Sequence, residues 1–141
     1  MTLQISTTHI SLIQRHGEAA YPEEGAGLIL GRELDGRKQV SKLLFLENSR
    51  ETAARHNRYQ LTAEDYIKGE LDAAQHGLDI LGVFHSHPDH PNTPSEFDRE
   101  WALPQLSYII TSIRQGKAVE SRSWVLHEDR SGFLPEEIQI K

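Results

Sequence analysis

The chain has 141 residues and no cysteine, which excludes disulfide cross-links and thiolate metal sites, so any metal must be bound by nitrogen and oxygen ligands. Its formal net charge is −6, and this argues against a nucleic-acid-binding protein, which needs a basic face. No apolar run approaches the roughly 20 residues of a membrane span, and the N-terminal segment lacks the basic opening of a signal peptide. We therefore expect one cytoplasmic domain, residues 1–141, with neither a nucleic-acid nor a membrane partner.

The N-terminal part of the chain predicts a helix. Thr7 or Thr8 can cap its start, and Pro22 ends it, because proline cannot continue a helix. Apolar and small residues recur between these points at spacings of three and four, which places them on one buried face. This face consists of Ile10, Ile13, Gly17 and Ala20.

A β-hairpin is expected next. Residues 27–31 form a short apolar run bounded by glycine, which is typical of a buried strand. Asp35-Gly36 is a turn signal, and residues 39–46 supply the partner strand. Residues 47–61 are polar and irregular, so we expect a loop there.

The middle of the chain predicts a second helix followed by a strand. Residues 62–65 combine a threonine cap with acidic residues in the first turn, and Gly77 is a stop signal. Residues 79–87 are predicted as a strand, in which alternate side chains share a face. The expected apolar stripe of the helix is Ile67, Leu71 and Ala74.

A third helix and three strands complete the chain. Thr93 is the expected helix cap, with Pro94 at the first helical position and Glu96 reaching back to close a capping box. This helix is expected to run to about Leu103, before Pro104. The predicted order αββαβαβββ indicates an α/β fold with a mixed, partly antiparallel sheet flanked by helices. The last three strands are expected at 106–113, 120–127 and 133–140.

Residues 85–98, HSHPDHPNTPSEFD, gather several side chains that can bind metal. His85 and His87 lie two apart at the end of a strand, so both point to the face that Leu81 and Val83 also occupy. Ser95 and Asp98 lie three apart near the start of a helix and share a face. Two imidazoles and one carboxylate suit zinc and leave a fourth coordination position open, as in catalytic sites. The alternative is a polar loop whose histidines are exposed or hydrogen-bonded.

The pattern His-x-His, seven residues, Ser-x-x-Asp, with Pro88 after His87, resembles the JAMM motif of MPN+ metalloproteases. That motif also has an upstream glutamate at the entry to a strand, and Glu24 in YPEEGAGLILG (residues 21–31) stands in its register. The neighbouring Glu23 is interpreted as a surface acid. The resemblance covers most of the chain and extends to SWVL at residues 123–126.

The resemblance implies a role for each residue. His85, His87 and Asp98 would bind one zinc ion, while Glu24 would act as general base toward water and then as acid toward the leaving amine. Ser95 would donate a hydrogen bond to the developing oxyanion. A nitrogen and oxygen ligand set suits zinc first, although iron or manganese would fit loosely.

Other polar and aromatic residues are weaker candidates. Asp89 and His90 could be alternative ligands or contact the ligands, but a solvated turn is the favoured interpretation. Asn48 could line a substrate groove or simply form a turn. Trp101 and Trp124 are predicted as core residues rather than recognition residues.

The resemblance also implies a class of substrate. The chain is similar to compact prokaryotic members that act on sulfur-carrier proteins with ubiquitin-like folds, so the expected reaction is hydrolysis of the peptide or isopeptide bond after a C-terminal Gly-Gly. A peptidase for cell-wall or phage-type peptides is one alternative, and a non-catalytic MPN scaffold or interaction module is another. Nucleic-acid processing would need a local basic patch, for which the candidates are Arg50, Arg55 and Arg58.

Overall fold

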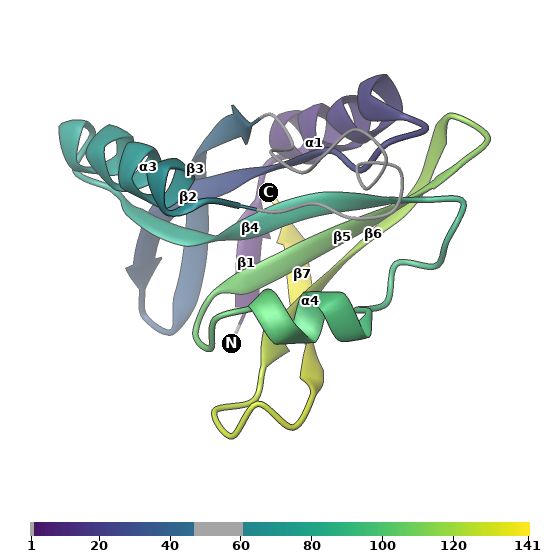
Figure 1. The fold of residues 1–141 in the computed structure, drawn as a ribbon. Helices are drawn as coiled ribbons and strands as arrows, with labels where there is room; N and C mark the ends of the chain where they lie inside the picture. The colour runs from purple at the N-terminus through teal and green to yellow at the C-terminus, as the bar shows by residue number, and fades with distance from the viewer. Residues whose placement is uncertain (1, 47–60) are drawn as a thin grey trace.

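The computed structural model describes residues 2–46 and 61–141 of the chain. Strands dominate it, and α1, α3 and α4 pack around them (Figure 1). In chain order the elements are β1 (Thr2–Ile5), α1 (Thr7–Ala20), β2 (Ala26–Leu34), β3 (Arg37–Leu46), α3 (Ala63–Gln75), β4 (Asp79–Pro88), α4 (Glu96–Trp101), β5 (Ser107–Arg114), β6 (Lys117–Leu126) and β7 (Phe133–Ile140).

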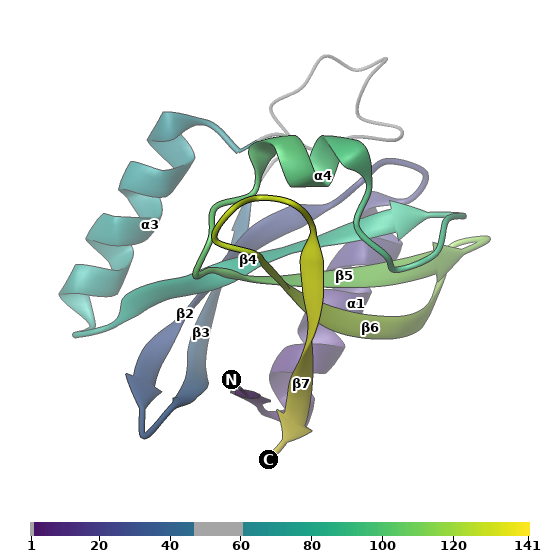
Figure 2. The ribbon, with the colours of Figure 1, turned by 90° about the horizontal axis from the view of Figure 1, so that it is seen from below.

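The strands form a closed barrel in the order β1-β3-β2-β4-β5-β6-β7, with β7 returning to β1 (Figure 2). β1 pairs parallel with β3 and with β7, and β4 pairs parallel with β5. The remaining pairs are antiparallel. The predicted α/β class with a mixed, partly antiparallel sheet is therefore confirmed.

β1 is the strand that the sequence pattern did not predict. Its four residues are too few to show a periodicity of two, and it is held by pairing with strands from distant parts of the chain. Leu3 and Ile5 are fully buried, and they pack in one hydrophobic cluster with Ile13, Ile29 and Phe84. The added strand changes the element order to βαββαβαβββ.

The first helix follows its prediction except at its cap. Ile13 and Gly17 are buried, and Ile10 packs against the same core. The cap is Ser6 rather than Thr7 or Thr8, because its hydroxyl accepts the backbone N–H of His9 at 3.0 Å. The helix ends at Ala20, just before Pro22, as expected.

The apolar stripe predicted for α3 is wrong. Ile67 and Leu71 are 58% and 62% exposed, and the helix instead buries Gly69 and Ala73. α3 approaches β2 so closely that a Cβ atom at Gly69 would lie 2.3 Å from Leu28 Cδ1. Small residues therefore form the contact face. Among the described helices, none has the length and apolarity needed to cross a bilayer.

A β-bulge changes the faces of β4. The pairing with β2 shifts between Ile29, which faces Gly82, and Leu30, which faces Ile80, so Leu81 is the extra residue. Leu81 consequently packs in the cluster that contains Phe84 rather than beside Val83, where strict alternation had placed it. Beyond the bulge the alternation holds.

The two tryptophans differ. Trp124 is buried, as predicted, but Trp101 is 53% exposed at the end of α4, so its assignment to the core is wrong. α4 has about a turn and a half and ends at Trp101 rather than near Leu103, and its C-cap Ala102 takes the buried position next to the exposed Trp101. Asn48, Arg50, Arg55 and Arg58 lie outside the described residues.

Candidate metal centre

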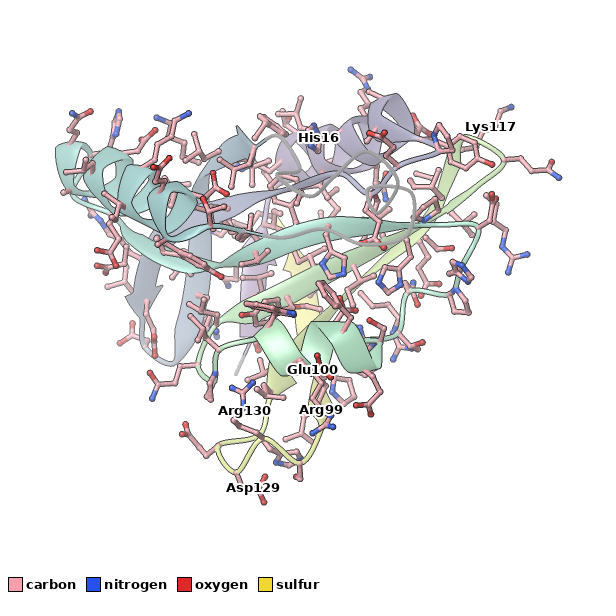
Figure 3. All side chains as sticks on the ribbon, in the orientation of Figure 1. His16, Arg99, Glu100, Lys117, Asp129 and Arg130 are labelled. Atoms are coloured by element: carbon pink, nitrogen blue, oxygen red, sulfur yellow. The ribbon has the colours of Figure 1, made fainter. Side chains whose placement is uncertain are left out.

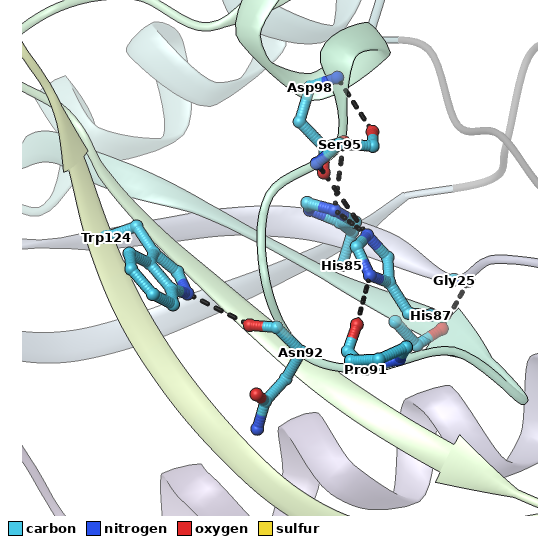
Figure 4. Close-up of polar contacts among 9 residues, drawn as sticks. Gly25, His85, His87, Pro91, Asn92, Ser95, Asp98 and Trp124 are labelled. Atoms are coloured by element: carbon cyan, nitrogen blue, oxygen red, sulfur yellow. Dashed lines mark hydrogen bonds and ion pairs between the residues drawn. The ribbon is translucent and has the colours of Figure 1, made fainter. Parts of the chain in front are cut away.

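The two histidines of the motif lie at the carboxyl end of β4, between β2 and β5. Both are buried, and their Nε2 atoms are 3.1 Å apart (Figure 4). The alternation of β4 places both rings on one face, while Ser86 between them points to the other. The expected convergence of His85 and His87 is therefore present.

Asp98 completes this cluster from the first turn of α4. Its Oδ1 atom lies 3.2 Å from His85 Nε2 and its Oδ2 atom 3.2 Å from His87 Nε2. Ligands of a tetrahedral ion bound at about 2.0–2.1 Å are about 3.3 Å apart, so these separations fit a single zinc-sized ion. The donor set of two imidazoles and one carboxylate is also one that zinc accepts.

The charges of the cluster favour a bound cation. Burial alone would raise the pKa of Asp98, but attraction to His85 and hydrogen bonds from both histidines hold it well below its ordinary value. Burial lowers the pKa of His85. Burial also acts to lower the pKa of His87, but its contacts with Asp98 outweigh burial and raise it. Asp98 is thus ionised at neutral pH, and the buried His85 ring is neutral and can donate a lone pair.

The turn after β4 fixes the tautomer of His87. Its Nδ1–H donates to the carbonyl oxygen of Pro91 at 2.7 Å, so Nε2 is the nitrogen that faces the cluster; it shares a proton with Asp98 in the metal-free protein and would present its lone pair to a metal ion that displaced that proton. The turn is braced in its place by Ser112, which donates to the carbonyl of His90 at 2.8 Å. The indole N–H of Trp124 donates to the carbonyl of Asn92 at 3.0 Å (Figure 4).

Both ends of α4 are held by side chains. Ser95, not the predicted Thr93, is the N-cap, and Asp98 rather than Glu96 closes the capping box. The predicted cap was wrong because Thr93-Pro94 carries the same signal two residues earlier. At the other end Arg130 donates to the carbonyls of Arg99, Glu100 and Ala102, and Arg99 and Arg130 lie together below the helix in Figure 3.

Glu24 reaches the cluster from the segment between α1 and β2. It is buried, and one of its carboxylate oxygens, with a ring nitrogen from each of His85 and His87, forms a group whose atoms all lie within 4.8 Å of one another. This group could itself hold a metal ion, so the geometry offers two carboxylates, Glu24 and Asp98, to the same histidine pair. The Asp98 oxygens are 3.2 Å from the histidine nitrogens.

A cleft of about 430 Å³ opens beside these residues. Glu24, His87 and Ser95 line it together, so the five predicted site residues converge in one place. Phe97, which the sequence pattern did not single out, forms part of its wall and packs against Trp101 in a tilted arrangement, with 6.0 Å between ring centroids. The remaining lining residues are His90, Pro91, Thr93, Pro94 and Glu96.

Asp89 and His90 are exposed and stand outside the histidine and carboxylate cluster. Asp89 instead connects the turn to its surroundings: it accepts from the Tyr21 hydroxyl at 2.6 Å and from the Gln115 backbone N–H at 2.9 Å. Its backbone N–H donates to the Ile113 carbonyl. Sequence spacing could not reveal these contacts, since Tyr21 and Gln115 are distant from the motif.

Residues 6–127 match the family model described as prokaryotic homologs of the JAB domain, Prok-JAB. The chain belongs to the Prok-JAB family. Two curated relatives of this Prok-JAB chain carry functional names. One is the desampylase of Pyrococcus furiosus, which is 28% identical over an alignment of 109 residues that covers 74% of this chain and 68% of that protein. The other is a probable TtuB-protein conjugate cleaving protease of Thermus thermophilus, 29% identical over 63% of this chain and 55% of that protein.

Solved structures resemble the Prok-JAB chain over its whole length. A Salinibacter ruber protein is 41% identical, with a TM-score of 0.77 and coverage of 100% of this chain and 92% of that one. The JAB1/MPN domain protein of Archaeoglobus fulgidus has a TM-score of 0.60 at 18% identity, covering 100% of this chain and 96% of that one. The chain therefore has the fold of a JAB1/MPN domain, as its resemblance to the MPN+ metalloproteases implied.

Proposed function

We propose that this Prok-JAB chain is a zinc-dependent peptidase that cleaves the peptide or isopeptide bond after the C-terminal Gly-Gly of a ubiquitin-like or sulfur-carrier protein. The observation that carries the proposal is the contact of His85, His87 and Asp98 at 3.1–3.2 Å beside the buried carboxylate of Glu24. We further propose that residues 1–141 form one domain and that the protein is cytoplasmic.

His85, His87 and Asp98 are the residues that would hold one zinc ion. Zinc bound there supplies Lewis acidity, which makes water a nucleophile at neutral pH. Asp98 is preferred over Glu24 as the third ligand because each of its oxygens lies within 3.2 Å of a histidine Nε2. This choice leaves Glu24 for proton transfer.

Glu24 and Ser95 supply the remaining chemistry. A carboxylate oxygen of Glu24 takes a proton from the attacking water and passes it to the leaving amine. The Ser95 Oγ atom accepts the Asp98 N–H, which leaves its own O–H proton available to donate into the cleft. A donor of this kind toward a developing oxyanion contributes about 3 kcal/mol in comparable acyl-transfer sites.

The names of the two curated relatives support the class of substrate. One is a desampylase and the other is named for cleaving TtuB-protein conjugates, so both names concern protein conjugates. The cleft is open to solvent and is lined by Glu24 and Ser95, so an extended chain end can reach both residues. We find no feature among the described residues that favours cell-wall peptides.

The test is metal analysis combined with cleavage of a carrier protein whose C-terminal Gly-Gly is extended by a peptide or joined to a lysine. Wild type, Glu24→Gln and Glu23→Gln are compared, since Glu23 is the adjacent acid and lies outside the cluster. Wild type and Glu23→Gln are expected to bind one zinc and to cleave. Glu24→Gln is expected to keep its zinc and to lose activity by at least about 100-fold.

The outcomes separate the competing functions. Zinc binding without cleavage of any Gly-Gly substrate would overturn the substrate proposal, and cleavage of peptidoglycan peptides instead would favour the cell-wall alternative. A protein that binds no zinc when metal is supplied would overturn the hydrolase and favour a non-catalytic MPN scaffold. Loss of zinc in Glu24→Gln would reassign Glu24 as a ligand.

A further inference from the structure

Ser86 stands between the two histidines but faces away from them. It is 2% exposed, and its Oγ atom accepts the backbone N–H of Gly25 at 2.9 Å. The backbone N–H of Ser86 donates to the carbonyl of Gly25 at 3.0 Å. One residue of β4 therefore contacts both the N–H and the carbonyl of the residue that directly follows Glu24.

These two bonds lie where the ladder between β2 and β4 ends. Ala26 and His85 are the last paired residues, and a continued antiparallel ladder would join Gly25 and Ser86 through two backbone bonds. In a continued ladder the Gly25 N–H would donate to the backbone carbonyl of Ser86. Here it donates to the Ser86 hydroxyl oxygen instead. The chain can therefore leave the sheet at Gly25 without leaving a buried N–H unpaired, and Glu24 is the next residue outward.

Helix α1 closes the other side of Ser86. A Cβ atom at Gly17 would lie 3.0 Å from Ser86 Cβ and 2.9 Å from Ile113 Cδ1, so the helix backbone packs directly against this part of the sheet. His16 approaches the same segment, since a Cβ atom at Gly25 would lie 3.0 Å from its Cδ2 atom. Water is excluded around the Gly25 N–H, and the Ser86 hydroxyl is the acceptor that it has there.

We propose that Ser86 is a positioning residue that holds the Glu24–Gly25 backbone and so places the Glu24 carboxylate beside the histidine cluster. The inference rests on the proposed catalytic role of Glu24. Ser86 acts through the backbone at Gly25 and does not touch the reacting atoms. Ser86, which lies between the proposed metal ligands His85 and His87, thus helps to position the proposed general base Glu24 on the neighbouring segment.

The first test uses metal-free protein, because it does not depend on activity. Amide hydrogen exchange at Gly25 is measured by NMR in wild type, Ser86→Ala and Ser123→Ala. Ser123 is a matched control: it is also a serine with 2% exposure, and its hydroxyl donates one bond, to Glu136 at 2.8 Å, away from the cluster. Exchange at Gly25 is expected to be about tenfold faster in Ser86→Ala and unchanged in Ser123→Ala.

The second test separates positioning from metal binding. Ser86→Ala is expected to bind one zinc with wild-type affinity, and to lower kcat by about tenfold or more with KM unchanged. Ser86→Thr, which keeps the hydroxyl, is expected to restore kcat. If Ser86→Ala does not fold, Ser86→Cys keeps the size of the side chain with a weaker acceptor and takes its place in both measurements.

Two results would overturn the inference: Gly25 exchange that is the same in Ser86→Ala as in wild type, or a loss of zinc affinity as large as the loss of kcat. The second result would mean that Ser86 acts through His85 and His87. Absence of cleavage by the wild type would overturn the proposed function instead, while Gly25 exchange in metal-free protein would still decide whether Ser86 holds this segment.

Discussion

Ser95 and Asp98 exchange two hydrogen bonds: the Ser95 N–H donates to Asp98 Oδ2 at 2.8 Å, and the Asp98 N–H donates to Ser95 Oγ at 3.1 Å. The capping box that begins α4 therefore also orients the carboxylate proposed to bind the metal and the proposed oxyanion donor. Because one local motif performs these structural and chemical tasks together, substitutions at Ser95 can separate them.

Ser95→Ala and Ser95→Gly should lose the same amount of activity but different amounts of stability. Alanine is a poor N-cap and costs about 1 kcal/mol of unfolding free energy, whereas glycine costs only a few tenths. Both remove the hydroxyl, so both should lower kcat by about 100-fold. Urea denaturation and steady-state kinetics measure the two effects. If kcat fell more in Ser95→Ala than in Ser95→Gly, in proportion to the loss of unfolding free energy, the hydroxyl would have no role in catalysis.

Asp98→Asn should destabilise the metal-free protein in a pH-dependent way. The folded-state pKa of Asp98 lies below its unfolded value of about 3.9, so its contribution is fully present above that value and is lost as the pH falls through the folded-state pKa. At pH 7 we expect a loss of about 3 kcal/mol, because a partner of two buried histidines is removed.

The difference between wild type and Asp98→Asn should shrink as the pH is lowered below about 4. Chemical denaturation across pH in the presence of a chelator measures it. Glu96→Gln on the same helix is the control, since its ion pair with Arg99 is exposed and contributes little. A pH-independent difference would show that Asp98 stabilises the fold by packing alone.

Trp124→Phe should weaken zinc binding although Trp124 touches no ligand. The substitution removes the indole N–H that holds the Asn92 carbonyl, next to the Pro91 carbonyl that orients His87. Contacts that orient a ligand typically contribute 10–100-fold to metal affinity, and we expect about tenfold for this more distant one. Competition with a chromogenic chelator measures the zinc affinity, and Trp101→Phe, at an exposed tryptophan, is the control. Equal zinc affinities in the two variants would show that the hydrogen bond from Trp124 to Asn92 does not support the metal site.

Lys38→Met should destabilise the barrel without affecting the metal centre. Lys38 is buried, donates to the Gln105 carbonyl and to Ser107 Oγ at 2.8 Å each, and lies 3.9 Å from the buried Glu136 carboxylate. Removing it leaves Glu136 as a buried charge without its partner, at a cost of about 3 kcal/mol. The double variant Lys38→Met/Glu136→Gln should lose less unfolding free energy than Lys38→Met, and urea denaturation measures the difference. Both variants should still bind one zinc ion.

Local patterns in the sequence were sufficient for most of the candidate site. Alternation along a strand put His85 and His87 on one face, and the three-residue spacing put Ser95 and Asp98 together at a helix start. These relationships depend on backbone geometry over a few residues, which the sequence determines directly. Glu24 was placed by its resemblance to the JAMM motif, since 61 positions separate it from His85 and no local geometry spans that distance.

Only the tertiary structure decided which face α3 buries and that β1 forms a strand. Ile67 and Leu71 form a good helical stripe, yet α3 buries Gly69 and Ala73, because the depth of a helix against a sheet is set by packing between distant segments. β1 has too few residues to be recognised by pattern and exists because β3 and β7 supply its hydrogen bonds. The contact of Ser86 with Gly25 is of the same kind. These two residues are distant in the sequence, and they can form a hydrogen bond only because the folded barrel brings them within 3 Å of each other.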